Sequence, residues 1–290
     1  MIKTIKTVMI SSLLVMSSNS FACDVEGKTG FLPDNDMYIG VSEKADNGMT
    51  EEIFNAVIDR VENYYSSVVA SKGANLVTLR KWEDGTVNAY ANQVGKTWQV
   101  HMFGGLARHR SVSPDGFALV MCHELGHHLA GAPKTTRMWI PTWASNEGQS
   151  DYWASMKCFR SVYGSDNNEA IVSNMTIDAE VVKKCEANWN TDSEIALCKR
   201  VSQASKGLAT LLNGDRPVDF ATPDKSVVSK TNHKHPAGQC RLDTYFHGAL
   251  CTKDITDETS NTDAKAGVCN RSEDYTDGVR PLCWFKPSNF

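Results

Sequence analysis

The pattern of apolar and polar positions predicts a helix and a small β-sheet in the first third of the chain. Residues 50–71 begin with a threonine, a common helix cap, and carry apolar residues at helical spacing. Residues 75–82 form a candidate strand, and residues 86–92 and 97–102 alternate in character on either side of Gly95. We therefore expect a helix, a strand and a β-hairpin in this region.

The next helix is expected at about residues 114–130. Ser113 is a good N-cap and is followed by proline and aspartate, which favour the first turn of a helix. Gly131 and Pro133 are typical of a helix end. One face is apolar and is formed by Phe117, Met121, Leu125 and Leu129. The spacing predicts a helix with one buried side.

Helical patterns continue further along the chain. A helix capped by Ser145 is expected next, with Tyr152, Met156 and Phe159 on its apolar face. Residues 166–207 are mostly helical by pattern and form the centre of a helical insert at about 161–212, whereas residues 213–230 are predicted to be a loop. The expected fold is α+β, with a mixed sheet over two functional helices.

The first 22 residues resemble a secretory signal peptide. Lys3 and Lys6 precede a short apolar run at residues 8–16, and Ser20-Phe21-Ala22 is similar to a cleavage site. A lipoprotein with an acylated Cys23 is the alternative, although the residues before that cysteine fit a lipobox poorly. We expect a single domain over residues 23–290, either periplasmic or secreted.

The net charge and the hydropathy of the chain limit the classes of binding partner that we expect. The net charge of −4 becomes −6 when the signal segment, with its two lysines and no acid, is removed. An acidic chain has no evident affinity for nucleic acid. No stretch of the expected mature chain is long and apolar enough to be an integral membrane segment. A peptide or protein substrate remains the expected partner.

The chain contains nine cysteines, for which disulfide bonds are the default expectation in an exported protein. Cys122 is expected to be a free buried thiol because it lies inside the helix at 114–130. Proximity in sequence favours Cys240–Cys251 and Cys269–Cys283 among many possible pairings. The sequence contains no Cys-x-x-Cys pair, the spacing that would favour a zinc site made of thiolates. The eight cysteines expected in bridges are Cys23, Cys158, Cys185, Cys198, Cys240, Cys251, Cys269 and Cys283.

Residues 123–127 of the expected helix, His-Glu-Leu-Gly-His, fit His-Glu-x-x-His. Residues four apart lie on one helical face, so His123 and His127 can bind one metal ion. Glu124 would lie beside the ion, where it can take a proton from a bound water. A pattern this short also occurs by chance, so its helical context supports the interpretation.

A catalytic zinc ion requires a third protein ligand. The best candidate is Glu147, with Asp151 one turn later as the partner of a ligand histidine. A solvated acidic face is the simpler alternative for this pair. The metal motif nearby favours a site for one zinc ion per chain.

These residues resemble those of the gluzincin peptidases, which carry His-Glu-x-x-His and a downstream glutamate. The Asn-Glu-x-x-Ser-Asp string at 146–151 is similar to thermolysin. The segments at 88–91 and 104–106, together with His235-Pro236 and Arg241-Leu242, resemble the CAAX prenyl endopeptidases and the HtpX-like and BepA-like proteases. This resemblance implies that Asn88 lies on a substrate-binding edge strand and that His235 and Arg241 face the zinc from the other side.

The chain departs from that family in lacking membrane helices, in its short gap to Glu147 and in its many cysteines. The leading hypothesis is an exported zinc metalloendopeptidase in which Glu124 is the general base. The alternative is a secreted zinc-containing peptide-binding or chaperone-like module on a peptidase fold. An intact glutamate beside the metal favours the enzyme, because a structural zinc site has no use for it.

Overall fold

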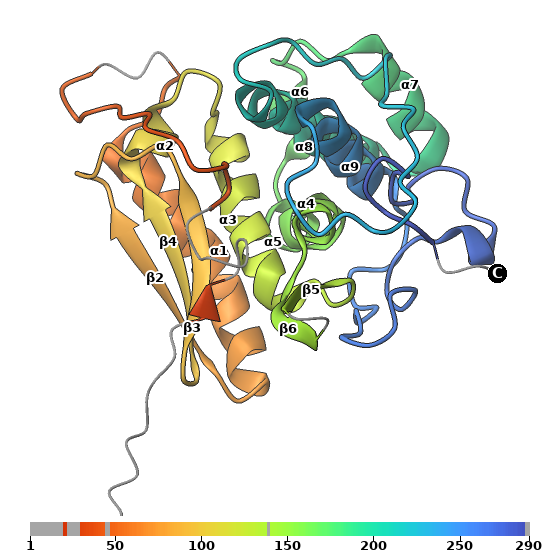
Figure 1. Ribbon diagram of the computed structural model, residues 1–290. Coiled ribbons are helices and arrows are strands. Elements are labelled where there is room, and N and C mark those ends of the chain that lie inside the picture. Colours follow the sequence, from red (N-terminus) through yellow and green to blue (C-terminus); the bar gives the residue numbers. More distant parts are fainter. Residues whose placement is uncertain (1–19, 22–29, 44–46, 138–139, 288–290) are drawn as a thin grey trace, which may run out of the picture.

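The computed structural model describes residues 20–21, 30–43, 47–137 and 140–287, which adopt an α+β fold (Figure 1). Its main sheet has four strands in the order β1, β3, β4, β2. Strand β3 is antiparallel to β1 and β4, whereas β2 runs parallel to β4, so the sheet is mixed as expected. The bounds are β1 Ser20–Phe21, β2 Asn75–Lys81, β3 Ala89–Val94 and β4 Thr97–Phe103.

Two long helices pack beside this sheet. Helix α1 (Glu51–Ser71) begins after Thr50, whose side chain accepts a hydrogen bond from the Ile53 amide, and it contacts β2. Helix α3 (Pro114–Leu129) begins after Ser113 as expected and contacts α1, β3 and β4. Figure 1 shows α3 between the sheet and the helices of the second half. Polar side chains on α3 are therefore enclosed from both sides.

The second half of the chain is mainly helical. Helix α4, a π-helical segment η1 and helix α5 follow one another without a break, and α9 packs against α4, η1 and α8. The region predicted to be a helical insert, about residues 161–212, contains most of α5 and the whole of α6, α7 and α8. The bounds are α4 Glu147–Trp153, η1 Ala154–Phe159, α5 Arg160–Tyr163, α6 Asn168–Val172, α7 Ala179–Asn188, α8 Asp192–Leu212, α9 Gly238–Leu250 and the 3-10 turn η2 Arg271–Glu273.

Several elements were not predicted from the sequence. The short helix α2 (Gly104–Arg108) starts with two glycines, and the hairpin of β5 (Lys134–Arg137) and β6 (Ile140–Ser145) contains Pro141 and has a register shift between Lys134 and Thr136. Helix α9 carries Gly238 and Gly248, residues that lower helix propensity. Its packing against three other helical segments stabilises it instead, which is a tertiary effect.

Four disulfides join the described cysteines, and they correct three expectations. Cys122 is bonded to Cys158 and is not a free thiol. The pairings Cys240–Cys251 and Cys269–Cys283 are wrong: the bonds are Cys240–Cys283 and Cys251–Cys269. The fourth bond joins Cys185 to Cys198. Cys23 lies outside the described residues, and the other eight cysteines are all paired with one another.

The physical reasons for these corrections lie in the helices. Cys240 lies in the first turn of α9 and Cys251 directly follows that helix, so the rise of about 1.5 Å per residue separates them far beyond disulfide reach. Cys122 lies on the side of α3 that packs against η1, where Cys158 is located. Both pairings depend on packing between distant segments. Four disulfides fit an oxidising compartment.

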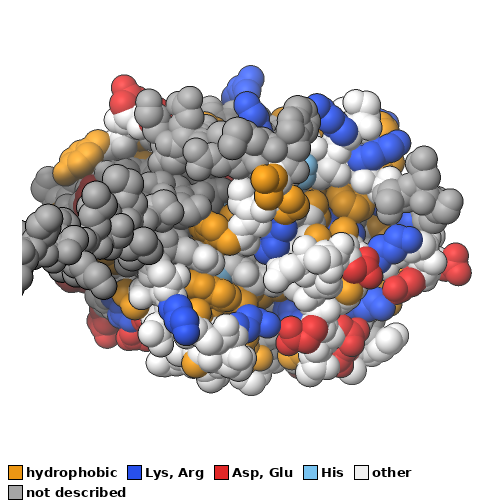
Figure 2. Space-filling model, turned by 60° about the horizontal axis from the view of Figure 1, so that its bottom comes forward, with side chains coloured by type: hydrophobic (Ala, Val, Ile, Leu, Met, Phe, Trp, Pro, Cys, Tyr) orange, Lys and Arg blue, Asp and Glu red, His pale blue; other side chains and the backbone are white. Residues whose placement is uncertain are grey.

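No described helix combines the length and the apolar character that a membrane span needs. The face shown in Figure 2 carries both acidic and basic side chains. The predicted signal segment lies outside the described residues except for Ser20 and Phe21, which form β1.

Candidate metal centre

Helix α3 brings three polar side chains into the protein interior. His123, Glu124 and His127 are each completely buried. The two histidine rings lie with their centroids 4.7 Å apart and nearly perpendicular. Buried polar groups require partners. The arrangement of these three side chains is therefore that of a site and not of a solvated helix face.

The first residue of α4 completes the group. Asn146 caps this helix through its side chain, and Glu147 points its carboxylate at the two histidines. Its Oε2 lies 3.4 Å from His123 Nε2, and its Oε1 lies 3.7 Å from His127 Nε2. The ligand atoms of the three residues lie within 4.8 Å of one another. His123, His127 and Glu147 thus form a buried group that could hold a metal ion, and we call these three residues the metal group.

Distances and unsatisfied atoms both fit such an ion. Tetrahedral coordination with bonds of about 2.0–2.1 Å places neighbouring ligand atoms about 3.4 Å apart. His123 Nε2 and Glu147 Oε2 are buried and have no hydrogen-bond partner among the described residues. Leaving buried polar atoms unsatisfied is costly, so these two atoms point to a ligand in the space between them.

The second ring nitrogen, Nδ1, of His123 and of His127 has a hydrogen-bond partner outside the metal group. His123 Nδ1 donates a hydrogen bond to Asp151 Oδ1 at 2.7 Å, and His127 Nδ1 donates to the Ser145 carbonyl at 2.8 Å. These bonds fix the tautomer in which Nε2 is available as a ligand atom. Asp151 is therefore the hydrogen-bond partner of the His123 ring on the side away from its Nε2 atom.

Arg241 on α9 supports Asp151 from the opposite side. Its Nε and one terminal nitrogen each lie 2.7 Å from an Asp151 carboxylate oxygen, which makes a bidentate ion pair. Its other terminal nitrogen donates to the Phe31 carbonyl at 2.9 Å. Arg241 is almost fully buried. Its closest approach to Glu147 is 3.9 Å, so its main contact is with Asp151 and not with the metal group.

Phe31 is a part of the site that sequence reasoning did not find. Its ring meets the His123 ring edge-on with centroids 5.1 Å apart, and the Arg241 guanidinium lies 4.7 Å from its centre. Phe31 has no helical or strand pattern around it, and only its place on the short segment before α1 brings it here. A motif search based on polar residues gives no signal for such a contact.

The charges of this cluster set its pKa values. Burial opposes ionisation of Glu147, but the nearby His235, His123 and His127 outweigh it and hold the Glu147 pKa well below its usual value. Burial likewise lowers the pKa of His123, yet Asp151 and Glu147 raise it to about 9. Burial lowers the pKa of His127 to about 4, which keeps that ring neutral and able to bind a metal ion.

Glu124 differs from the other acids of the site. Both of its carboxylate oxygens are buried without a hydrogen-bond partner among the described residues. Its Oε2 lies 3.9 Å from His127 Nε2, so it stands beside the metal group. Burial raises the pKa of Glu124 to about 8. Its oxygens are therefore available to a molecule bound in the site.

Of the two remaining predicted residues, His235 lies beside Glu147, whereas Asn88 contacts the segment at residues 30–32. His235 Nε2 lies 3.4 Å from Glu147 Oε2 and donates to the Gly30 carbonyl at 2.9 Å. Asn88 directly precedes β3, and its amide bonds both the N–H and the carbonyl of Leu32. His128, expected to be structural, stacks between Trp98 and Trp143 and is outside the metal group.

The chain matches no protein-family model. Neither the curated proteins nor the solved structures gave a match. The site itself therefore carries the functional inference.

Proposed function

We propose that the chain is an exported zinc metalloendopeptidase with His123, His127 and Glu147 as ligands. The observation that carries this proposal is Glu124, a buried carboxylate beside the ligand group with two unpartnered oxygens. Imidazole and carboxylate ligands suit zinc, and three protein ligands leave one position for water. A purely structural zinc site has four protein ligands and no adjacent free acid.

When bound, zinc lowers the pKa of a coordinated water and polarises the carbonyl to be attacked. The charge of a bound ion would favour the carboxylate form of Glu124 over the protonated form that burial favours without it. The Glu124 carboxylate would then accept the proton of that water and pass it to the leaving amine. Asp151 holds His123 in the ligand tautomer, and Arg241 keeps Asp151 ionised and in place. Among the described side chains near the ligands, His235 supplies a donor for the oxyanion, at present bonded to the Gly30 carbonyl.

An extended peptide fits the outer edge of β3. In the structure β1 covers this edge by pairing Ser20 with Gln93 and Phe21 with Asn92. Cleavage after residue 22 would remove β1 and open the backbone at Asn92 and Gln93 for strand addition. At the start of this edge the Ala89 carbonyl already accepts from the Phe31 amide, and the Asn88 side chain bonds Leu32. The proposed substrate is therefore a peptide segment bound as an additional strand.

The test compares wild type with Glu124→Gln in the mature chain. The glutamine keeps the size of the side chain but cannot take the proton of the water, so turnover of unfolded casein should fall at least about 10²-fold. Zinc content by elemental analysis should stay at one per chain. Glu186→Gln, on the exposed face of α7, is the matched control and should cleave like wild type.

Chelator-sensitive cleavage that is absent in Glu124→Gln supports the peptidase. If fully zinc-loaded wild type cuts neither casein nor a peptide library, and both proteins bind peptides equally, the peptidase proposal fails. The peptide-binding module would then be the better description.

A further inference from the structure

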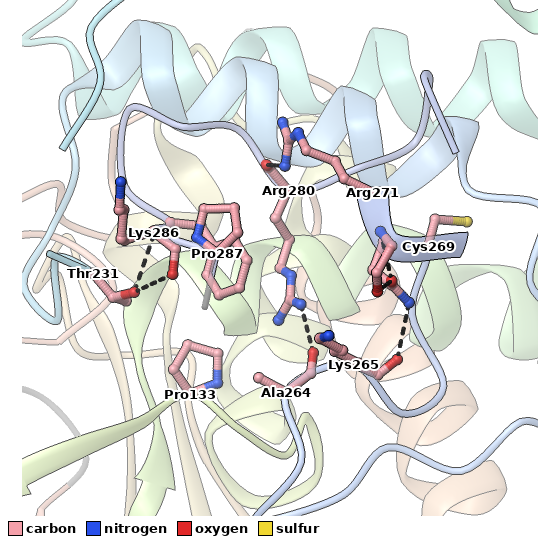
Figure 3. A pocket seen from close by; sticks show the side chains of 12 residues that line it. Pro133, Thr231, Ala264, Lys265, Cys269, Arg271, Arg280, Lys286 and Pro287 are labelled. Atoms are coloured by element: carbon pink, nitrogen blue, oxygen red, sulfur yellow. Dashed lines mark hydrogen bonds between the residues drawn. The ribbon is translucent and has the colours of Figure 1, made fainter. Parts of the chain in front are cut away.

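A cavity that shares no lining residue with the metal group lies at the C-terminal part of the chain. It offers about 180 Å³ and is lined mainly by residues 264–287, together with Pro133 and with Thr231, which lies beside Lys286 and is bonded to it (Figure 3). Four of its lining residues are cationic and none is acidic; the cations are Lys265, Arg271, Arg280 and Lys286. Such a surplus of one charge in a partly apolar cavity calls for a compensating group.

Arg280 is the central cation of this cavity. Only 1% of the residue is exposed, and Figure 3 shows its side chain extending between Pro287 and Ala264. One terminal nitrogen donates to Gln149 Oε1 at 3.0 Å and the other donates to the Ala264 carbonyl. Both acceptors are neutral. Its Nε is buried and has no acceptor among the described residues.

A buried guanidinium usually has a carboxylate partner. Arg241 shows the usual arrangement, with a bidentate bond to Asp151. Arg280 has instead the face of Phe285, whose ring centre lies 3.8 Å away. Burial lowers the pKa of Arg280 to about 10, and the nearby Tyr152 and Asp263 offset this only in part. None of the described residues that line the cavity is acidic.

We propose that this cavity binds a small organic carboxylate with an apolar body. The carboxylate would lie beside Arg280 and between the exposed Lys265 and Lys286, while Pro133, Phe285 and Pro287 would contact the apolar part. The site is separate from the metal group and independent of peptide cleavage.

A carboxylate fits better than phosphate for two reasons. The fully buried cation is a single guanidinium, so a single negative charge balances it without burying a second one. The walls are largely apolar, and a strongly hydrated dianion would lose its water there without enough donors in return. An aromatic acid such as benzoate combines a single negative charge with a flat apolar ring, and these two features match the cationic and the apolar residues of the lining.

The first experiment observes Arg280 directly in the intact protein. In ¹H–¹⁵N spectra of the arginine Nε–H groups, millimolar benzoate should shift the Arg280 signal with saturation. The Arg108 signal is the internal control, because its Nε already bonds the Ile39 carbonyl. Benzyl alcohol, a neutral analogue, and inorganic phosphate are the comparison probes. Both should bind at least about tenfold more weakly than benzoate.

Variants supply the second readout, in isothermal titration of benzoate. Arg280→Met should abolish binding, and because this buried change can disturb folding, Lys265→Ser/Lys286→Ser is tested beside it. The double variant changes only exposed side chains and should weaken binding about 3- to 10-fold, more at low salt than at high salt. Lys183→Ser, an exposed lysine on α7, should bind benzoate like wild type.

The proposal is overturned if benzoate leaves the Arg280 signal unmoved, or if benzyl alcohol or phosphate binds as tightly as benzoate. Equal benzoate affinity in wild type and the double lysine variant would also overturn it. None of these results depends on zinc or on cleavage.

Discussion

Asp151 connects the metal group to the helix on its far side. It accepts from His123 on α3 and from Arg241 on α9, and all three side chains are buried. Burial opposes ionisation of Asp151, but the charges of Arg241 and His123 outweigh it and keep the pKa of Asp151 below its usual value. The orientation of His123, a candidate metal ligand, thus depends on a carboxylate outside the group His123, His127 and Glu147.

The first prediction changes this carboxylate. Asp151→Asn should weaken zinc binding about 10- to 100-fold, because the amide holds His123 less firmly and makes the ring a poorer ligand. Competition with a fluorescent zinc chelator measures the affinity. Asp166→Asn is the control. Asp166 also pairs with a buried arginine, Arg200, and its ion-pair partners in the described chain, Arg60 and Arg200, do not belong to the metal group. Unchanged affinity in Asp151→Asn would exclude the supporting role.

The second prediction concerns pH and the metal-free protein. The folded pKa of His123, about 9, exceeds its unfolded value of 6.5, so protonated His123 stabilises the fold. That contribution is complete below pH 6.5 and is lost as pH rises through about 9. It amounts to at most about 3 kcal/mol. Urea unfolding of the chelated protein across this pH range measures it.

In Asp151→Asn the main cause of the raised His123 pKa is gone, so the part of this decline above about pH 8 should largely disappear. Glu124, whose pKa burial raises from 4.5 to about 8, gives a separate decline that ends near pH 8. A decline of equal size above about pH 8 in the variant would assign the effect to another group.

At the scale of the elements, the close approach of α3 and α4 determines the geometry of the site. Gly126 lies on α3 where α4 crosses it, and a Cβ there would come within 3.0 Å of Ser150 Cα and 3.1 Å of its carbonyl oxygen. These are backbone atoms that cannot rotate away. The glycine inside the histidine motif thus permits the helix that carries Glu147 to lie close enough.

The third prediction follows from this contact. Gly126→Ala should destabilise the protein by about 1–3 kcal/mol and weaken zinc binding, because α4 must move away from α3. Gly116→Ala in the same helix is the matched control, since its nearest neighbour would be the Ser113 side chain at 3.3 Å. It should stay within about 1 kcal/mol of wild type. Thermal unfolding and zinc titration of both variants check this.

The elements also show what sequence alone can predict. Helix α3, helix α1 and the hairpin of β3 and β4 have strong periodicity and clear caps, so their bounds agree with expectation within a few residues. The metal group was predictable because its spacing is local to two helices. The disulfide partners, α9 and Phe31 depend on contacts between segments far apart in the chain, and no local pattern encodes these contacts.

At the scale of the whole molecule, α3 joins the sheet to the helical half, and Cys122–Cys158 fastens it there. This bond connects the residue beside His123 to η1, which continues directly from the helix of Glu147. It closes a loop of 36 residues, for which chain entropy gives a stabilisation of about 4 kcal/mol.

The fourth prediction removes this bond. Cys122→Ala/Cys158→Ala should lower the free energy of unfolding by about 4 kcal/mol and weaken zinc binding, because the two ligand helices lose their covalent connection. Cys185→Ala/Cys198→Ala is the control within the helical insert. It should cost about 3 kcal/mol but leave zinc affinity unchanged. Equal zinc affinity in both double variants would show that packing alone holds the site.

The same bond would govern when such a peptidase becomes active. Thiols stay reduced in the cytosol, so a newly made chain would carry its two ligand helices without the bond that fastens them. Oxidation after export would complete the site where the proposed substrates are encountered. The proteins of the producing cell would thus be protected by redox chemistry during synthesis, without a separate inhibitor.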